Sequence, residues 1–333
     1  MLIRYFRKLQ ALTPLLLFLI GAVLWSETWF SPEPVFYFSS PTNAGPFYLY
    51  LQPAFEWNPL VSWVGAFVFL YMQAILLNQI VTSQGILDKY SFLTSLIYVM
   101  LMSSSLGALY LHPLLFSNFF IIIAIKKIFQ TYDEEIVLVE VFNVGMLISI
   151  AGLFYYPAWV FFILLIISLF IFYIVDIRSF LAASIGLLLP VFFLALYLFL
   201  TDNLLVEFFE FPLHVAFPDL SMDSHSGVTK IFNGFLAGLS IMAVSHMIFL
   251  HIPDKPIRLR KRLWVLFYFL LTSLLAIFFI PAFEVIHISL LFLPLSVILA
   301  GFFHQIDRKV IAEVLFTVLI GLTIAGKIHN LLQ

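Results

Sequence analysis

The positively charged residues of this chain stand in short clusters between long apolar stretches. Only 16 Lys and Arg residues occur among 333, and hydrophobic residues make up 63%. A water-soluble domain is close to half apolar and about a quarter charged, so this composition does not provide a water-exposed surface. Apolar stretches separated by cationic turns indicate a chain that crosses a lipid bilayer several times.

Eleven apolar segments have the length expected of membrane spans. A helix needs about 20 apolar residues to cross the hydrocarbon core, where it satisfies its own backbone hydrogen bonds. Runs such as 159–170 show no alternation of apolar and polar residues, which argues against a transmembrane β-barrel. We therefore predict an all-α, polytopic integral membrane protein with about eleven transmembrane helices. The predicted spans are 11–27, 59–81, 91–110, 113–128, 138–155, 158–176, 179–200, 228–251, 263–280, 283–303 and 310–328.

The cations also predict which way the chain faces, because cytoplasmic segments of membrane proteins carry an excess of Lys and Arg. With a cytoplasmic N-terminus, only Lys230 and Lys327 fall outside the cytoplasmic segments. We expect Lys327 to extend its ammonium group toward the outer interface. The other fourteen cations are Arg4, Arg7, Lys8, Lys89, Lys126, Lys127, Arg178, Lys255, Arg258, Arg260, Lys261, Arg262, Arg308 and Lys309.

The predicted spans leave little chain for a soluble part. We expect one membrane domain over residues 1–333, with outer loops at about 28–58 and 201–227 and no separate soluble domain. The first loop is rich in Pro and aromatic residues, and the second is acidic.

The acidic outer loop contains the first candidate functional residues. Glu207, Glu210 and His214 follow the spacing of one helix face, where carboxylates and an imidazole could bind a divalent cation or transfer protons. Pro212 interrupts such a helix, and the alternation with Phe and Leu is also typical of a segment lying on the membrane surface. The surface interpretation is favoured.

A second candidate pair opens the tenth predicted span. Glu284 and His287 are three residues apart, so on a helix they share a face and could relay a proton or hold a metal. One pair lacks the partner helices that metal-binding bundles use, so a simple hydrogen-bonded pair is favoured. We assign no catalytic residue and expect no cofactor and no metal. Glu207, Glu210, His214, Glu284 and His287 stay as weak catalytic candidates.

Several polar side chains lie within the predicted spans. They could join helices by hydrogen bonds or line a path through the membrane, and the first use is the common one. The sequence Gly234–Gly238 is a GxxxG pattern, which predicts a close helix contact. The polar residues concerned are Asn78, Gln79, Asn118, Asn143, Asn233 and His246.

Three of the middle spans carry a resemblance to a known family. Asn118 with the basic pair Lys126 and Lys127, the run Val141–Gly145, and the segments 152–156 and 161–165 are similar to an uncharacterised family of polytopic inner-membrane proteins from Bacteroidota. The resemblance covers roughly residues 75–200. It implies a multi-pass protein of the bacterial inner (cytoplasmic) membrane, and it implies no functional residue, because the family has no assigned activity.

The absence of catalytic motifs limits the functions that the sequence favours. The chain has no Walker lysine motif, no HExxH, no G-x-S-x-G and no cysteine, and no predicted span has a central charge. We expect a non-catalytic inner-membrane component of envelope biogenesis, in contact with the lipid bilayer and possible membrane-protein partners but not with nucleic acid. The alternatives are a membrane glycosyltransferase or polymerase acting on lipid-linked sugars, and a transporter of lipids or small molecules.

Overall fold

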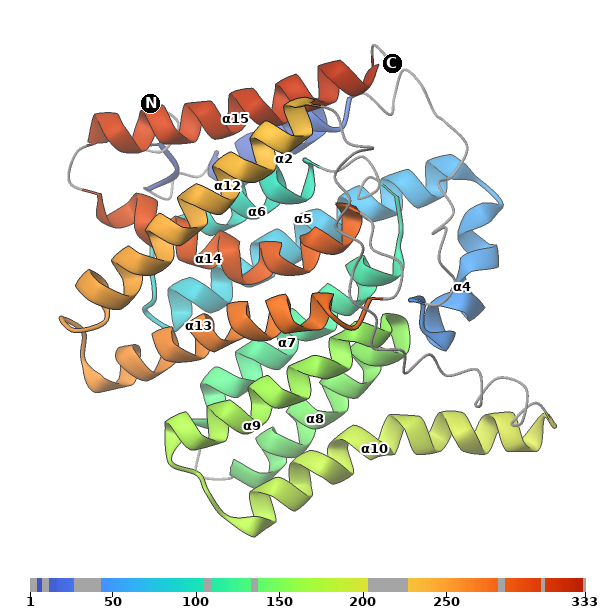
Figure 1. Ribbon diagram of the computed structural model, residues 1–333. Helices are drawn as coiled ribbons and strands as arrows, with labels where there is room; N and C mark the ends of the chain where they lie inside the picture. Colours follow the sequence, from blue (N-terminus) through green and yellow to red (C-terminus); the bar gives the residue numbers. More distant parts are fainter. Residues whose placement is uncertain are drawn as a thin grey trace.

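The regular structure of the protein is helical. The computed structural model (Figure 1) describes residues 5–7, 12–26, 43–104, 110–132, 137–202, 227–280, 285–306 and 309–331, in which one isolated bridge, between Ala44 and Tyr155, is the only β pairing. The α-helices are α2 (Thr13–Leu24), α4 (Pro46–Glu56), α5 (Pro59–Ser83), α6 (Leu93–Met102), α7 (Pro113–Thr131), α8 (Val137–Phe154), α9 (Phe161–Phe172), α10 (Ile177–Leu200), α12 (Gly227–His246), α13 (Ile257–Ile277), α14 (Ser289–Gln305) and α15 (Lys309–Leu331). Short helical turns are η2 (Tyr156–Val160), η4 (Met247–His251) and η5 (Val285–Ile288).

Each of the eleven predicted spans contains a helix, but the number of spans is not confirmed. Among the described residues, seven helices are long and apolar enough to cross a membrane, and they correspond to α5, α7, α8, α10, α12, α14 and α15. The segments around α2, α6 and α9 form shorter apolar helices, and α13 opens with four cations. The chain is therefore a multi-pass membrane protein with seven candidate spans in the part that the structure describes.

Helix α6 differs most from its predicted span of 91–110. It has ten residues, a rise of about 15 Å, which is half the thickness of the hydrocarbon core. Every residue of α6 is buried, so the helix packs inside the bundle instead of facing lipid. Helix α14, 83% of whose membrane window is buried, lies beside it. These two helices form the centre of the fold.

The outer loop predicted at 28–58 contains a helix that the sequence analysis did not predict. Gly45 precedes α4, and Pro46 at its first turn has the fixed φ that suits a helix start. Gly45 donates from its backbone N–H to Phe154 O at 2.9 Å. A Cβ at Gly45 would lie 2.1 Å from Leu153 O, so glycine allows this close approach. The segment before α4 is thereby fixed to the end of α8.

Helices α8 and α10 pack through glycine. A Cβ at Gly145 would lie 2.3 Å from Ala183 O, and a Cβ at Gly186 would lie 2.2 Å from Phe142 O. The contact is reciprocal, and it holds α10 against α8 in Figure 1. By contrast, no described atom lies within 4 Å of a Cβ built at Gly234 or Gly238. The predicted GxxxG contact is therefore absent from the described packing.

The ends of several helices that carry cations meet at one end of the bundle. Arg262 donates to Gln84 O at 3.0 Å, and Arg7 donates to Phe303 O. The Lys261 ammonium lies over the rings of Tyr132 and Tyr173, 4.7 and 4.5 Å from their centroids. These contacts bring the end of α5, the ends of α7 and α9, the start of α13 and the end of α14 together. The predicted cytoplasmic segments are therefore neighbours in space.

Lys327 does not extend outward as expected. Its side chain is buried, and its ammonium group donates to Leu24 O at the end of α2. The last carbonyls of a helix carry partial negative charge, so a cation there satisfies both an unpaired acceptor and the helix dipole. Lys327 thus fastens α15 to α2.

Candidate functional site

Four polar side chains form a buried group at the end of the bundle opposite the cationic one. We call this group the outer polar cluster, after the side of the membrane predicted for it from the cations: Asn43, His112, Tyr155 and His287. The Tyr155 hydroxyl lies 2.8 Å from His287 Nδ1, and Asn43 Nδ2 lies 3.5 Å from His287 Nε2. The Tyr155 and His287 rings stack with centroids 5.8 Å apart. Each residue has at most 3% of its surface exposed.

The cluster is assembled from element ends. His112 is the N-cap of α7, Tyr155 follows α8, and His287 belongs to η5. Asn43 is positioned by the neighbouring bridge between Ala44 and Tyr155. Because backbone groups at helix ends lack partners within the helix, polar side chains are common there. Their convergence from distant parts of the chain is a property of the fold.

His112 has a defined tautomer. Its Nδ1 accepts from the Leu115 backbone N–H at 3.2 Å, so the neutral ring carries its proton on Nε2. Within the described residues, this buried Nε2 has no hydrogen-bond partner. An unpaired buried donor costs about 1–3 kcal/mol. Burial, and then the neighbouring His287, lowers the pKa of His112 to about 3, so the ring is a neutral donor at physiological pH.

Of the five predicted site residues, the structure describes the side chain of one. His287 lies in the outer polar cluster with Tyr155 and Asn43. Glu207, Glu210, His214 and Glu284 lie outside the described residues, so their predicted pairings stay predictions. His112, Asn43 and Tyr155 were not predicted from the sequence as site residues. The one local signal was His112 directly before Pro113, a pattern typical of a helix start.

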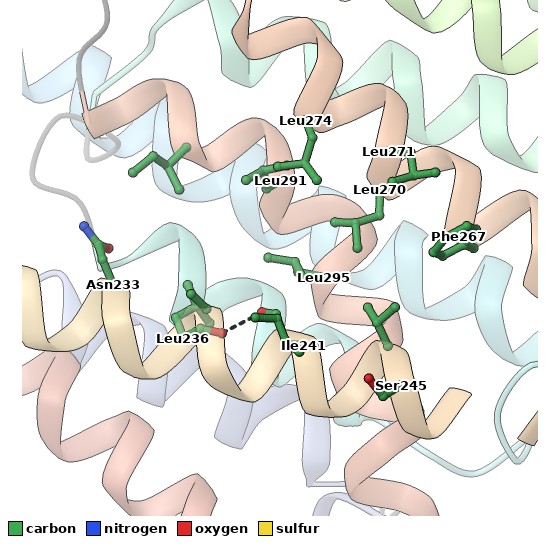
Figure 2. A pocket seen from close by; sticks show the side chains of 14 residues that line it. Asn233, Leu236, Ile241, Ser245, Phe267, Leu270, Leu271, Leu274, Leu291 and Leu295 are labelled. Carbon is green, nitrogen blue, oxygen red and sulfur yellow. Dashed lines mark hydrogen bonds between the residues drawn. The ribbon is translucent and has the colours of Figure 1, made fainter. Parts of the chain in front are cut away.

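An apolar groove lies between α12, α13 and α14 (Figure 2), and we call it the lateral groove. Its volume is about 480 Å³. Asn233 lies at one end, and Ser245 and Phe267 lie at the other. The Ser240 hydroxyl is turned back to Leu236 O at 2.6 Å, the bond drawn in Figure 2, so it presents little polarity. The lining residues are Asn233, Leu236, Ala237, Ser240, Ile241, Val244, Ser245, Phe267, Leu270, Leu271, Leu274, Ile288, Leu291 and Leu295.

The lateral groove faces the lipid side of the bundle. Only 28% of the membrane window of α12 is buried, and Leu271 and Leu274 of α13 are exposed. Between Asn233 and Ser245, α12 rises about 18 Å. One leaflet of the hydrocarbon core is about 15 Å thick, so the two lengths are close. Water gains no hydrogen bonds from such walls. A single acyl chain matches both the length and the apolar lining.

The short helix η5 joins the lateral groove to the outer polar cluster. His287 is fully buried in the cluster, and the next residue, Ile288, lines the groove. Successive side chains of a tight helix point in different directions, so one turn contributes to both features. A molecule with an apolar chain and a polar end could therefore contact both.

A separate buried network ties the middle helices together. Tyr98 donates to Gln73 Oε1 at 2.7 Å, and Gln73 Nε2 donates to Leu115 O at 2.7 Å. These bonds connect α5, α6 and α7, and the buried amide of Asn118 lies beside them on α7. Such interhelical bonds contribute about 0.6 kcal/mol each in membranes. The network is an interhelical staple, but both amide atoms of Asn118 lack a hydrogen-bond partner among the described residues, so the predicted stapling role of Asn118 is not confirmed.

The other predicted polar positions do not surround one cavity. Asn78 donates to Ser91 O at 3.0 Å, His246 packs edge-on against Phe302, and Asn233 lines the lateral groove. Asn143 is half-buried on α8. This separation argues against the translocation path that these residues were considered to line. Within the described residues, no group of three or more His, Cys, Asp or Glu side chains could hold a metal ion.

No family model, curated protein or solved structure matches this chain. The resemblance to the Bacteroidota family therefore stays an expectation.

Proposed function

We propose that the protein is a non-catalytic component of envelope biogenesis that binds one long-chain lipid in the lateral groove. The proposal includes a position in the bacterial inner membrane with a cytoplasmic N-terminus and further spans beyond the seven candidates. Envelope assembly handles lipids and lipid-linked molecules, so a bound lipid links the groove to the role that the sequence favoured.

The groove itself carries the proposal. An apolar hollow of about 480 Å³ on a lipid-facing surface is filled by whatever apolar molecule surrounds it, and in a bilayer that is an acyl chain. Leu236, Leu270 and Leu295 form its floor, and the groove is as long as one leaflet's chain. Ligand sites of this kind are apolar with a few polar groups at one end.

The first test fills the groove. Leu271→Trp would place an indole in the space of the acyl chain, because Leu271 lines the groove and is itself exposed to lipid. We expect the purified variant to lose labelling by a phospholipid with a photoreactive chain, while the wild type is labelled on α12 and α13. The label sites are read by peptide mass spectrometry.

The matched control is Leu188→Trp on α10. Leu188 is 61% exposed and lies outside the groove, so its substitution by Trp adds the same bulk to a lipid-facing surface. Labelling of α12 and α13 should be unchanged in this variant. Equal labelling of wild type and Leu271→Trp would reject the proposed function.

The enzymatic alternative has a different requirement. A transferase acting on lipid-linked sugars would need acidic side chains at the polar end of the groove. The acidic residues of the predicted 201–227 loop lie almost entirely outside the described residues, so no observation here favours it. Membrane-protein partners of the predicted kind stay a prediction for the same reason.

A further inference from the structure

The outer polar cluster presents a buried hydrogen-bond donor that the described residues do not satisfy. His112 is 3% exposed, its Nδ1 is used by the Leu115 N–H, and its Nε2–H has no acceptor in the described part of the chain. Buried polar groups are almost always paired in folded proteins. The backbone holds this donor in one tautomer. It is therefore available to an acceptor that another molecule supplies.

The second imidazole strengthens this preference for an acceptor. His287 is close enough to His112 for the charge on one ring to disfavour charge on the other. Because the Asn43 amide nitrogen can only donate, His287 accepts from it at Nε2 and carries its proton on Nδ1, from which it donates to the Tyr155 hydroxyl oxygen. The cluster then holds one unsatisfied donor, the His112 Nε2–H, and no carboxylate among its described members. A cationic group would find no partner there, whereas an oxygen would.

The position of the cluster next to the lateral groove indicates which molecule would supply this oxygen. His287 and Ile288 are consecutive residues of η5, and Ile288 belongs to the lateral groove. A chain lying in the groove would carry its polar end toward the turn that holds His287. Asn233, the polar residue at one end of the groove in Figure 2, offers a further amide to the same molecule.

We infer that the outer polar cluster binds an acceptor oxygen at the polar end of the lipid whose chain occupies the lateral groove, with His112 Nε2–H as its donor. The inference rests on the proposed function. The acceptor is an oxygen of an ester carbonyl or of a phosphate, because both are strong acceptors next to the acyl chains of membrane lipids. Burial supports the neutral state of the donor, since it lowers the pKa of His112.

The first experiment compares four probes with the same photoreactive chain on the purified full-length wild type in detergent micelles. They are a diester phospholipid, its diether analogue, a diacylglycerol and a plain hydrocarbon. Loss of binding with the diether analogue assigns the ester carbonyl, and loss with the diacylglycerol assigns the phosphate. Either result supports the inference. A hydrocarbon that competes as well as the diester phospholipid overturns it.

The second experiment changes the donor. His112→Phe keeps an aromatic ring and removes the N–H, and His112→Gln restores an N–H donor. Losing one hydrogen bond should weaken diester binding by about tenfold in His112→Phe. We expect His112→Gln to recover part of that loss, and His246→Phe, outside the cluster, to bind as wild type does. Unchanged diester affinity in His112→Phe contradicts the inference.

The two proposals fail in different ways. If the lateral groove holds a lipid but His112 does not bind its oxygen, all four probes label α12 and α13 equally in wild type and in His112→Phe. If the groove holds no lipid, the Leu271→Trp variant and the wild type give the same labelling. The wild-type probe comparison needs no variant, so it decides the matter even if His112→Phe does not fold.

Discussion

Two glycines decide how closely α8 and α10 approach. Each lies against a backbone carbonyl of the other helix, so even a methyl group must push the helices apart. We predict that Gly186→Ala destabilises the protein by about 1–3 kcal/mol, the usual cost of overpacking. The measurement is thermal unfolding of the purified protein in detergent.

Gly321→Ala is the control for this prediction. No described atom lies within 4 Å of a Cβ at Gly321, and alanine is a better helix former than glycine. We expect this variant to be as stable as the wild type or slightly more stable. A Gly186→Ala protein that unfolds at the wild-type temperature would show that α8 and α10 are not in this close contact.

The buried imidazole of His112 makes stability depend on pH. The pKa of His112 is about 3 in the fold and near 6.5 in an unfolded chain, so the unfolded state binds the proton more readily. Stability should therefore be constant above about pH 6.5 and fall as the pH drops from there toward the folded pKa.

His112→Gln isolates this effect from the other titrating groups. The variant lacks the imidazole, so its unfolding temperature should fall less between pH 7.5 and pH 5 than that of the wild type. The readout is the difference between the two pH slopes. Equal slopes for both proteins would mean that His112 is not buried and neutral in the fold.

At the scale of the helix, one buried cation joins α15 to α2. The Lys327 ammonium meets the Leu24 carbonyl, and next to it the Trp25 indole donates to Ser103 Oγ at 2.9 Å. We predict that Lys327→Met loosens α2, because a buried carbonyl then loses its charged donor at a cost of about 1–3 kcal/mol.

This loosening is measurable by limited proteolysis between α2 and α4. Lys230→Met is the matched control, since Lys230 is exposed on α12 and its substitution removes the same charge. Faster cleavage should appear in Lys327→Met alone. If both variants are cleaved at the wild-type rate, the cation does not hold α2.

The helices themselves were largely predictable from the sequence, whereas their contacts were not. A long apolar run in lipid has one solution for its backbone, so each predicted span contains a helix. The shortness of α6 could not be read from its apolar residues, because an internal helix and a lipid-facing one are both apolar. Helix α4 was missed because its sequence lies in a loop rich in proline and aromatic residues.

In the candidate site, too, the contacts between residues could not be predicted from the sequence. Local spacing suggested Glu284 as the partner of His287, but the described partners, Tyr155 and Asn43, are far away in the sequence. Such pairs arise from helix packing, which no local pattern encodes. The lateral groove was not predictable either. Of the residues that line it, only Asn233 was considered as a polar position, and no sequence pattern shows that α12 stands away from α13.

For the whole molecule, the decisive property is which end of the bundle faces the cytoplasm. The described contacts gather Arg7, Lys261 and Arg262 at one end, and the outer polar cluster lies at the other. The excess of cations predicts that the first end is cytoplasmic. In Figure 1 the turn between α12 and α13 and the turn between α9 and α10 lie at the same side of the bundle.

The chain has no cysteine, so single cysteines can report this orientation without a background. We predict that cysteines at Asp176 and Asp254 are protected from a membrane-impermeant maleimide in intact spheroplasts and react after lysis. Cysteines at Asn58 and Asp202 should react before lysis, because they follow α4 and α10 at the opposite end. The reverse pattern would mean that the protein has the opposite orientation, with its N-terminus outside. A mixed pattern, with Asp176 and Asp254 on different sides, would mean that α10 and α12 do not both cross the bilayer. The side of the membrane assigned to the outer polar cluster would then be wrong.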